Sequence, residues 1–222
     1  MELVKNGHAC VTLVSRGLRI LIDPGAFTPD VPQLLAEADT VLVTHSHIDH
    51  FDAEALTTAL DARPELPLFG PSDVVDALAG TASAANGHVA QVDGGETFDV
   101  LGATVRAVGG EHASIHAGIA VPYNVGYVID GLVYHPGDAL RVPPVPVHTL
   151  LVPVSGPWTK VGDAIDFIDA VDPEQTVQIH DAMLSEVGVR STTMFLGESG
   201  LTGRPMVVLG TGESLDVTAG RR

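Results

Sequence analysis

The sequence predicts a mixed α/β protein, in which helices cover sheets that contain both parallel and antiparallel strands. Three observations lead to this prediction: short apolar runs typical of strands, helix-like segments between them, and hairpin signals in both halves of the chain. The 24 glycines and 15 prolines, spread over 222 residues, favour many short elements joined by tight turns. Hairpins that recur beside alternating helices and strands indicate mixed sheets rather than a purely parallel sheet.

The first half of the chain is predicted to open with a hairpin of residues 11–14 and 18–22, which ends at Asp23. Residues 40–43 form a short, continuous apolar run, as expected for a buried strand. Asp52 stands before Ala53-Glu54-Ala55-Leu56 and is a predicted helix N-cap. The other elements predicted in this half are a helix that runs from Ala53 toward Asp61, a helix at residues 71–79, and strands at residues 89–92, 97–101 and 104–108.

The second half contains a strong short hairpin signal, Asp130-Gly131, between apolar runs at residues 125–129 and 132–135. We find no linker and no low-complexity tract, so residues 1–222 are expected to form a single domain. The remaining predicted elements are a strand at residues 150–154, a helix at residues 161–171 and a strand at residues 176–179.

Composition and charge limit the classes of partner. The formal net charge of −17 repels polyanions, which argues against nucleic acid as substrate and favours a small molecule. No apolar stretch is long enough to span a bilayer, and residues 11–22 are broken by Arg16 and Arg19, unlike a signal peptide. We therefore expect a cytoplasmic protein that does not bind membranes. Cys10 has no partner for a disulfide within the chain, and a homo-oligomer is left open.

A dense group of metal-ligand residue types follows the apolar run at residues 40–43. The run Thr44-His45-Ser46-His47-Ile48-Asp49-His50 lies in the loop between a predicted strand and a predicted helix. In an extended segment, His45 and His47 point to the same side, as residues i and i+2 do. Asp49 and His50 then turn with the chain toward a second point. The spacing therefore predicts two imidazoles for one metal ion and a carboxylate with an imidazole for its neighbour.

This run resembles the hallmark of the metallo-β-lactamase superfamily, which is His-x-His-x-Asp-His after a buried strand. The resemblance extends to four further motifs in the expected order. Asp23 follows an earlier strand, His112 follows Val108-Gly109-Gly110, Asp138 ends His135-Pro136-Gly137-Asp138, and His180 follows Thr176-Val177-Gln178-Ile179.

The resemblance implies a four-layer αββα sandwich with two metal ions at the edge of its two mixed sheets. Their expected ligands are His45, His47 and His112 for the first ion, Asp49, His50 and His180 for the second, and Asp138 between the two. Nitrogen and oxygen ligands suit Zn best, with Mn or Fe as alternatives. The implied activity is hydrolysis by a metal-bound hydroxide of a small ester, lactone, thioester or phosphoester. Asp49 and Asp23 are also expected catalytic residues, and Asp23 is expected to act by hydrogen bonds within the site instead of binding metal.

The short layout is most similar to the branch that includes ascorbate-6-phosphate lactonase. Two other classes stay open, a metal-dependent phosphodiesterase or nuclease and a non-catalytic, metal-binding regulatory protein. The acidic charge argues against a nuclease, and no ligand position is lost, as a non-catalytic descendant would show.

Several residues outside the ligand set have open roles. His116 is a second candidate beside His112, but His112 directly follows the Gly109-Gly110 turn, so His112 is the predicted ligand and His116 at most a catalytic pocket residue. His135 is a candidate to hydrogen-bond a ligand. Trp158 and Lys160 are predicted either to line the pocket or, for Trp158, to fill the core. No function is assigned to the three histidines without a motif, which are His8, His88 and His148.

Overall fold

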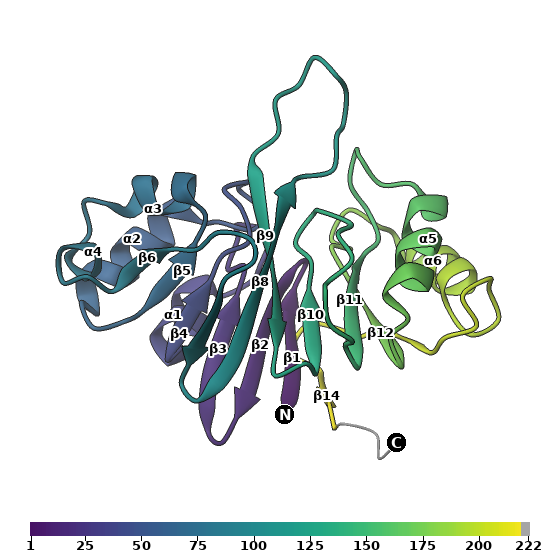
Figure 1. Cartoon of the computed structure of the whole chain (residues 1–222), viewed down its shortest axis with the longest axis horizontal. Coiled ribbons are helices and arrows are strands. Elements are labelled where there is room, and N and C mark those ends of the chain that lie inside the picture. The colour runs from purple at the N-terminus through teal and green to yellow at the C-terminus, as the bar shows by residue number, and fades with distance from the viewer. Residues whose placement is uncertain (219–222) are drawn as a thin grey trace.

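The computed structural model describes residues 1–218 and contains two β-sheets packed face to face, with helices on both outer sides (Figure 1). Four helices of the first half of the chain cover one sheet, and two helices of the second half cover the other. The layers therefore follow the order helix, sheet, sheet, helix. This arrangement confirms the predicted αββα fold class.

The first sheet has seven strands, six of them from the first half of the chain. In chain order they are β1 (Glu2–Gly7), β2 (Cys10–Ser15), β3 (Leu18–Ile22), β4 (Thr40–Leu42), β5 (Leu68–Gly70), β6 (Val89–Gln91) and β14 (Ser214–Asp216). Their order in the sheet is β14-β1-β2-β3-β4-β5-β6. The pairs from β14 to β3 are antiparallel, and the pairs from β3 to β6 are parallel.

The second sheet also has seven strands. They are β7 (Thr97–Val100), β8 (Ala103–Glu111), β9 (Tyr123–Ile129), β10 (Val133–His135), β11 (Thr149–Pro153), β12 (Gln175–Ile179) and β13 (Met206–Val207). Their order is β13-β12-β11-β10-β9-β8-β7, with antiparallel pairs from β7 to β10 and parallel pairs from β10 to β13. Both sheets are therefore mixed, as the sequence predicts.

The helices cover the sheets with apolar faces. Those over the first sheet are α1 (Val31–Glu37), α2 (Ala53–Ala62), α3 (Ser72–Leu78) and α4 (Ala82–Ala85), and those over the second are α5 (Val161–Val171) and α6 (Glu186–Leu196). Leu56 and Leu60 of α2 pack under the first sheet, and Phe167 and Ile168 of α5 pack under the second. A third cluster, which includes Tyr127, fills the space between the sheets. None of the helices in the described residues is long and apolar enough to cross a membrane.

The predicted elements are present with small differences at their ends, but the turn expected at Gly109-Gly110 is wrong, because both glycines pair with β9 and β8 continues to Glu111. Asp52 caps α2, because its Oδ1 accepts a hydrogen bond from the Ala55 amide at 3.0 Å. Asp130 and Gly131, with φ angles of 52° and 67°, form the predicted turn between β9 and β10. The sequence analysis missed several elements: β1, α1, β5, α4, α6, β13 and β14.

Candidate metal centre

The seven predicted metal ligands meet at one edge of the sandwich. Four of them lie on the loop between β4 and α2, and three come from segments that follow β8, β10 and β12 of the second sheet. Strands that end at the same edge bring these segments together, although they are far apart in the sequence. The metal-ligand loop is thus completed by three segments of the opposite sheet.

The first group contains His45, His47 and His112, whose ligand atoms lie within 4.8 Å of one another. The Nε2 atom of His45 is 3.1 Å from Nδ1 of His47. The ring of His112 lies edge-on to both, with ring centroids 5.0 Å from His45 and 4.6 Å from His47. Three imidazole nitrogens at this separation could hold one ion. The structure thus brings His112, and not His116, to this group.

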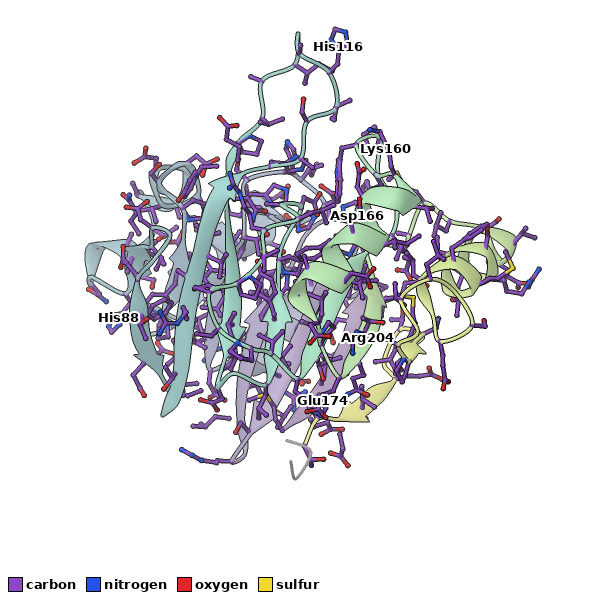
Figure 2. The ribbon with its side chains drawn as sticks, turned by 45° about the vertical axis from the view of Figure 1, so that its right-hand side comes forward. His88, His116, Lys160, Asp166, Glu174 and Arg204 are labelled. Carbon is purple, nitrogen blue, oxygen red and sulfur yellow. The ribbon has the colours of Figure 1, made fainter. Side chains whose placement is uncertain are left out.

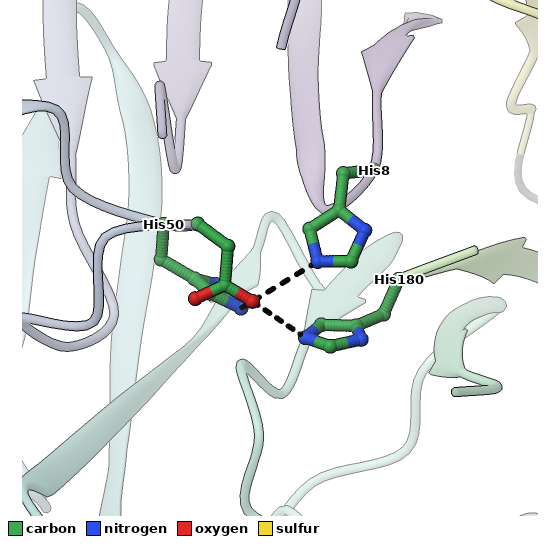
Figure 3. A group of neighbouring side chains, drawn as sticks. His8, His50 and His180 are labelled. Carbon is green, nitrogen blue, oxygen red and sulfur yellow. Dashed lines mark hydrogen bonds and ion pairs between the residues drawn. The ribbon is translucent and has the colours of Figure 1, made fainter. Parts of the chain in front are cut away.

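The second group contains Asp49, His50 and His180. Oδ2 of Asp49 lies 3.3 Å from Nε2 of His180 and 4.0 Å from Nε2 of His50. His8 joins the same group, with its Nε2 atom 3.1 Å from the same carboxylate oxygen (Figure 3). The sequence analysis gave His8 no function.

Asp138 lies between the two groups. Its Oδ2 is 3.2 Å from Nε2 of His112 in the first group and 3.1 Å from Nε2 of His180 in the second. Its Oδ1 is 3.3 Å from Nε2 of His50. One carboxylate thus contacts ligand atoms of both groups, which is the placement that a bridging ligand requires.

Asp23 orients two of the histidines. It accepts hydrogen bonds from the Thr44 amide, the Thr44 hydroxyl and Nδ1 of His50, each at 2.7 Å. Because Nδ1 of His50 carries the proton of this hydrogen bond, the lone pair available to a metal ion is the one on Nε2. The Thr44 hydroxyl donates its proton to Asp23, so the hydroxyl oxygen accepts a hydrogen bond from Nδ1 of His45 at 3.0 Å. Nδ1 of His45 therefore carries the proton of that ring, and Nε2 carries the lone pair. Asp23 therefore acts on both groups without touching the ligand atoms.

Several polar atoms at the centre have no hydrogen-bond partner among the described residues. Nδ1 of His112 donates to the Ala113 carbonyl at 2.6 Å, so its Nε2 also points a lone pair inward. Among the described residues, Nε2 of His50, Oδ1 of Asp138 and both ring nitrogens of His180 are buried without a hydrogen-bond partner. Buried polar atoms are rarely left unpaired. Lone pairs that converge in this way fit divalent metal ions.

Close backbone contacts hold the carboxylates in place. Asn124 donates to the Pro136 carbonyl at 2.8 Å, and its Oδ1 accepts from the Asp138 amide at 3.0 Å. Gly137 adopts a φ of 61°, and a Cβ there would lie 2.2 Å from Oδ1 of Asn124. A Cβ on Gly25 would lie 2.0 Å from the backbone of Asp49. Both turns therefore require glycine.

Electrostatics in the metal-free protein follow from this packing. Burial alone would raise the pKa of Asp138, but the nearby His50 and His180 hold that pKa well below its usual value. Burial alone would lower the pKa of His50, but Asp138 and Asp23 raise it well above the ordinary value, so a metal ion that binds Nε2 must displace a proton from that atom. Burial, with His50 nearby, lowers the pKa of His45 well below the usual value. His45 therefore stays neutral, which is the form in which an imidazole can bind a metal ion.

The structure does not bring His116 to the site. It lies on the exposed loop between β8 and β9, and Figure 2 shows it at the tip of that loop, pointing away from the body of the molecule. Its Nδ1 accepts a hydrogen bond from the Gly118 amide at 3.0 Å. A chain of ten residues after His112 extends past the sheet edge before it returns in β9, and His116 is carried outward with it.

The other residues with open roles differ in how deeply they are buried. His135 is fully buried, and it donates from Nε2 to the Ala9 carbonyl at 2.8 Å and accepts at Nδ1 from the Gly137 amide at 3.1 Å. Trp158 is 8% exposed and lies edge-on to His112 and His180, with ring centroids 5.6 Å and 5.8 Å away. Lys160 is exposed and 3.8 Å from Asp163 (Figure 2). His135 and Trp158 thus support the centre, and Lys160 lies at the surface.

Comparisons with known proteins identify the family of the chain. The family described as the beta-lactamase superfamily domain matches residues 2–180. Protein Rv0786c of Mycobacterium tuberculosis is 35% identical over 190 residues, which cover 83% of this chain and 86% of that protein. UPF0173 protein PF0020 of Pyrococcus furiosus is 32% identical over 195 residues, which cover 84% of this chain and 86% of that protein.

A solved structure shows the same fold. Igni18, described as a novel metallo hydrolase from the archaeon Ignicoccus hospitalis, superposes with a TM-score of 0.72 over 96% of this chain and 97% of that one, at 20% sequence identity. The superfamily predicted from the motifs is thus confirmed, while the placement beside ascorbate-6-phosphate lactonase stays a prediction. Because the family match spans residues 2–180 and the Pyrococcus relative is 32% identical over most of both chains, the chain belongs to the beta-lactamase superfamily and, within it, to the UPF0173 family.

Proposed function

We propose that the protein is a hydrolase that uses two divalent metal ions to cleave a small ester, lactone, thioester or phosphoester. The observation that carries the proposal is the position of Asp138 between two groups of histidines whose ring nitrogens point lone pairs at it. Other members of the UPF0173 family, such as one from Thermoplasma acidophilum, are named metal-dependent hydrolases, which supports the reaction class.

Different residues of the chain have different roles in the proposed reaction. Bound divalent ions supply a water of lowered pKa as nucleophile and a Lewis acid for the attacked oxygen. Asp23 holds the ring of His50 and, through Thr44, the ring of His45. The side chain of Asp49 is 18% exposed, against 2% for Asp138. Asp49 is therefore the carboxylate that we place on the side from which substrate approaches.

The donor set supports zinc. Histidine nitrogens and carboxylate oxygens are ordinary zinc ligands, and they also accept Mn or Fe. Cys10 supplies no thiolate, because it is fully buried, its Sγ accepts from Asn6 at 3.5 Å, and burial raises its pKa to about 12. We propose zinc as the resident metal, with Mn and Fe as the alternatives.

The size of the neighbouring groove and the charge of the chain support a small substrate. A groove of about 510 Å³ is lined by His8, which contacts Asp49, and by Phe27 and Asp181 among other residues. This volume is in the range of small-molecule sites. The net charge of −17 supports a small molecule over nucleic acid as partner, and we propose a cytoplasmic location on the sequence features given above.

Metal analysis combined with a substrate screen tests the proposal. Protein purified under metal-replete conditions should contain close to two ions per chain by elemental analysis, and the loaded protein should hydrolyse at least one substrate among lactones, thioesters, carboxyl esters and phosphoesters. The Asp138→Ala variant is the control in every assay. At most one ion per chain contradicts the dinuclear centre, and a salt-sensitive shift of an RNA oligomer contradicts the small-molecule assignment.

A further inference from the structure

His8 lies in the hairpin between β1 and β2 and reaches the second ligand group from the side opposite His50. Its side chain is fully buried, and its ring is tilted by 49° against the ring of His180, with centroids 3.9 Å apart. The His8 carbonyl accepts the His180 amide at 2.9 Å. Figure 3 shows the rings of His8, His50 and His180 converging from different segments of the chain. By distance alone, His8 could be a further nitrogen ligand of the second ion.

The position of the proton on the His8 ring argues against His8 as a metal ligand. The backbone amide of Ala182 donates a hydrogen bond to Nδ1 of His8 at 3.2 Å. An amide can donate only to a lone pair, so Nδ1 carries no proton, and in a neutral ring the proton must then be on Nε2. A protonated Nε2 cannot bind a metal ion. It can donate to Oδ2 of Asp49, which is 3.1 Å away.

His8 differs from its neighbours in this respect. Nδ1 of His50 donates to Asp23 and Nδ1 of His112 donates to a carbonyl, so in both rings the free lone pair is on the Nε2 atom that faces the centre. In His8 the backbone partner is a donor rather than an acceptor, which reverses the tautomer.

We propose that His8 is a positioning residue that donates a hydrogen bond from Nε2 to Asp49 and thereby sets the orientation of this ligand for the second metal ion. This inference rests on the metal centre proposed above. Outer partners that hydrogen-bond a ligating carboxylate typically change metal affinity by about 10–100-fold when they are removed. The turn also contacts His180, so one hairpin supports ligands from both sheets.

Two substitutions separate the two hydrogen bonds of the ring. In His8→Gln, the side-chain amide can reach the former Nε2 position and donate to Asp49. In His8→Asn, the shorter amide oxygen can accept from Ala182, but no donor reaches Asp49. The backbone of His8 has a φ of 49°, a region that asparagine tolerates well, so weaker zinc binding in His8→Asn would not come from strain in the turn.

Metal titration of the three proteins tests the proposal with a readout other than turnover. We expect His8→Asn to weaken binding of the second zinc ion by about 10–100-fold and to leave the first ion unchanged, since His8 contacts no residue of the first group. His8→Gln should bind both ions nearly as tightly as the natural sequence. Equal weakening in both variants would overturn the proposal, because a lost nitrogen ligand affects both. No weakening in His8→Asn would overturn it as well.

Nitrogen NMR of the histidine rings provides a test that does not depend on metal binding. The His8 signal, identified by its absence in His8→Gln, should show a protonated Nε2 both before and after zinc is added. A signal protonated at Nδ1 instead would overturn the proposal. If the natural protein binds no metal at all, the proposed function fails, while the spectrum of the metal-free protein still decides whether His8 donates to Asp49.

Discussion

The two sheets contribute to the metal centre in different ways. The first sheet supplies four of the ligand side chains on one loop of six residues, from His45 to His50, directly after β4. The second sheet supplies three, each at the end of a different strand and separated by 26 or more residues. The contiguous set is fixed by local backbone geometry, whereas the dispersed set depends on the packing of a whole sheet. Within the dispersed set, Asp138 contacts both groups, so its substitution should affect both ion sites, whereas substitution of His112 should affect the first site.

Removal of Asp138 should have the largest effect, because this dispersed carboxylate contacts both groups. In Asp138→Ala we expect hydrolysis to fall on the order of 10³-fold or more, which corresponds to about 4 kcal/mol of transition-state free energy. Elemental analysis should show fewer ions per chain. Asp166→Ala, at an exposed position on α5 (Figure 2), is the matched control. Full activity in Asp138→Ala would contradict the bridging role.

Chelation should affect both sheets at once, because the ions would be held by ligands from each. A ligand present at a thousand times its dissociation constant stabilises the folded state by about 4 kcal/mol. For a domain of this size, metal removal should therefore lower Tm on the order of 10 °C. Differential scanning calorimetry with and without a chelator measures this shift. An unchanged Tm in protein shown to have carried metal would mean that the ions do not link the sheets.

Asp23→Asn tests how the contiguous ligands on the loop from His45 to His50 are oriented. The carboxylate accepts three hydrogen bonds, and an amide in its place turns a donor toward one of those partners. We expect metal affinity to fall by about 10–100-fold. Asp39→Asn, which changes a carboxylate that accepts from the Arg19 amide of β3 at 2.8 Å, is the control. Competition with a coloured chelator measures the metal affinity of both variants. Equal affinities in Asp23→Asn and Asp39→Asn would show that Asp23 does not help to orient the metal ligands.

The smallest effect is expected at His116, which lies on the loop between two of the dispersed positions. His116→Ala should keep its full metal content and change the unfolding free energy by less than about 0.5 kcal/mol, as is usual for surface sites. His112→Ala, only four residues earlier, should lose metal from the first site. Metal loss in His116→Ala with retention in His112→Ala would show that the loop enters the site in a different register.

The same contrast explains what could be predicted from the sequence. The contiguous motif reveals itself by spacing, and turns such as Asp130-Gly131 carry local signals that the structure confirms. The dispersed ligands His112, Asp138 and His180 could be proposed only through the resemblance, because nothing local joins them. That the seven act as ligands stays a prediction, although the structure brings them together.

The missed elements have physical causes. The strand β1 contains Lys5, a residue expected at the surface, but here it is buried in an ion pair with Asp181. The helix α6 contains Gly188 and adjacent threonines, which are poor helix formers, and it leaves Phe195 exposed. His8 makes its side-chain contacts with residues 41 and 174 positions away, so no short motif could have indicated its place in the site.

The pairing of β14 with β1 has a consequence for the order in which the protein can assemble during synthesis. Strands β1 to β6 lie within the first 91 residues and can pair with one another early. The outer edge of β1, however, has no partner until residues 214–216 have left the ribosome. An open edge strand is a template for pairing with other chains. The nascent chain is therefore most prone to aggregation in this interval, and the arrival of β14 ends it.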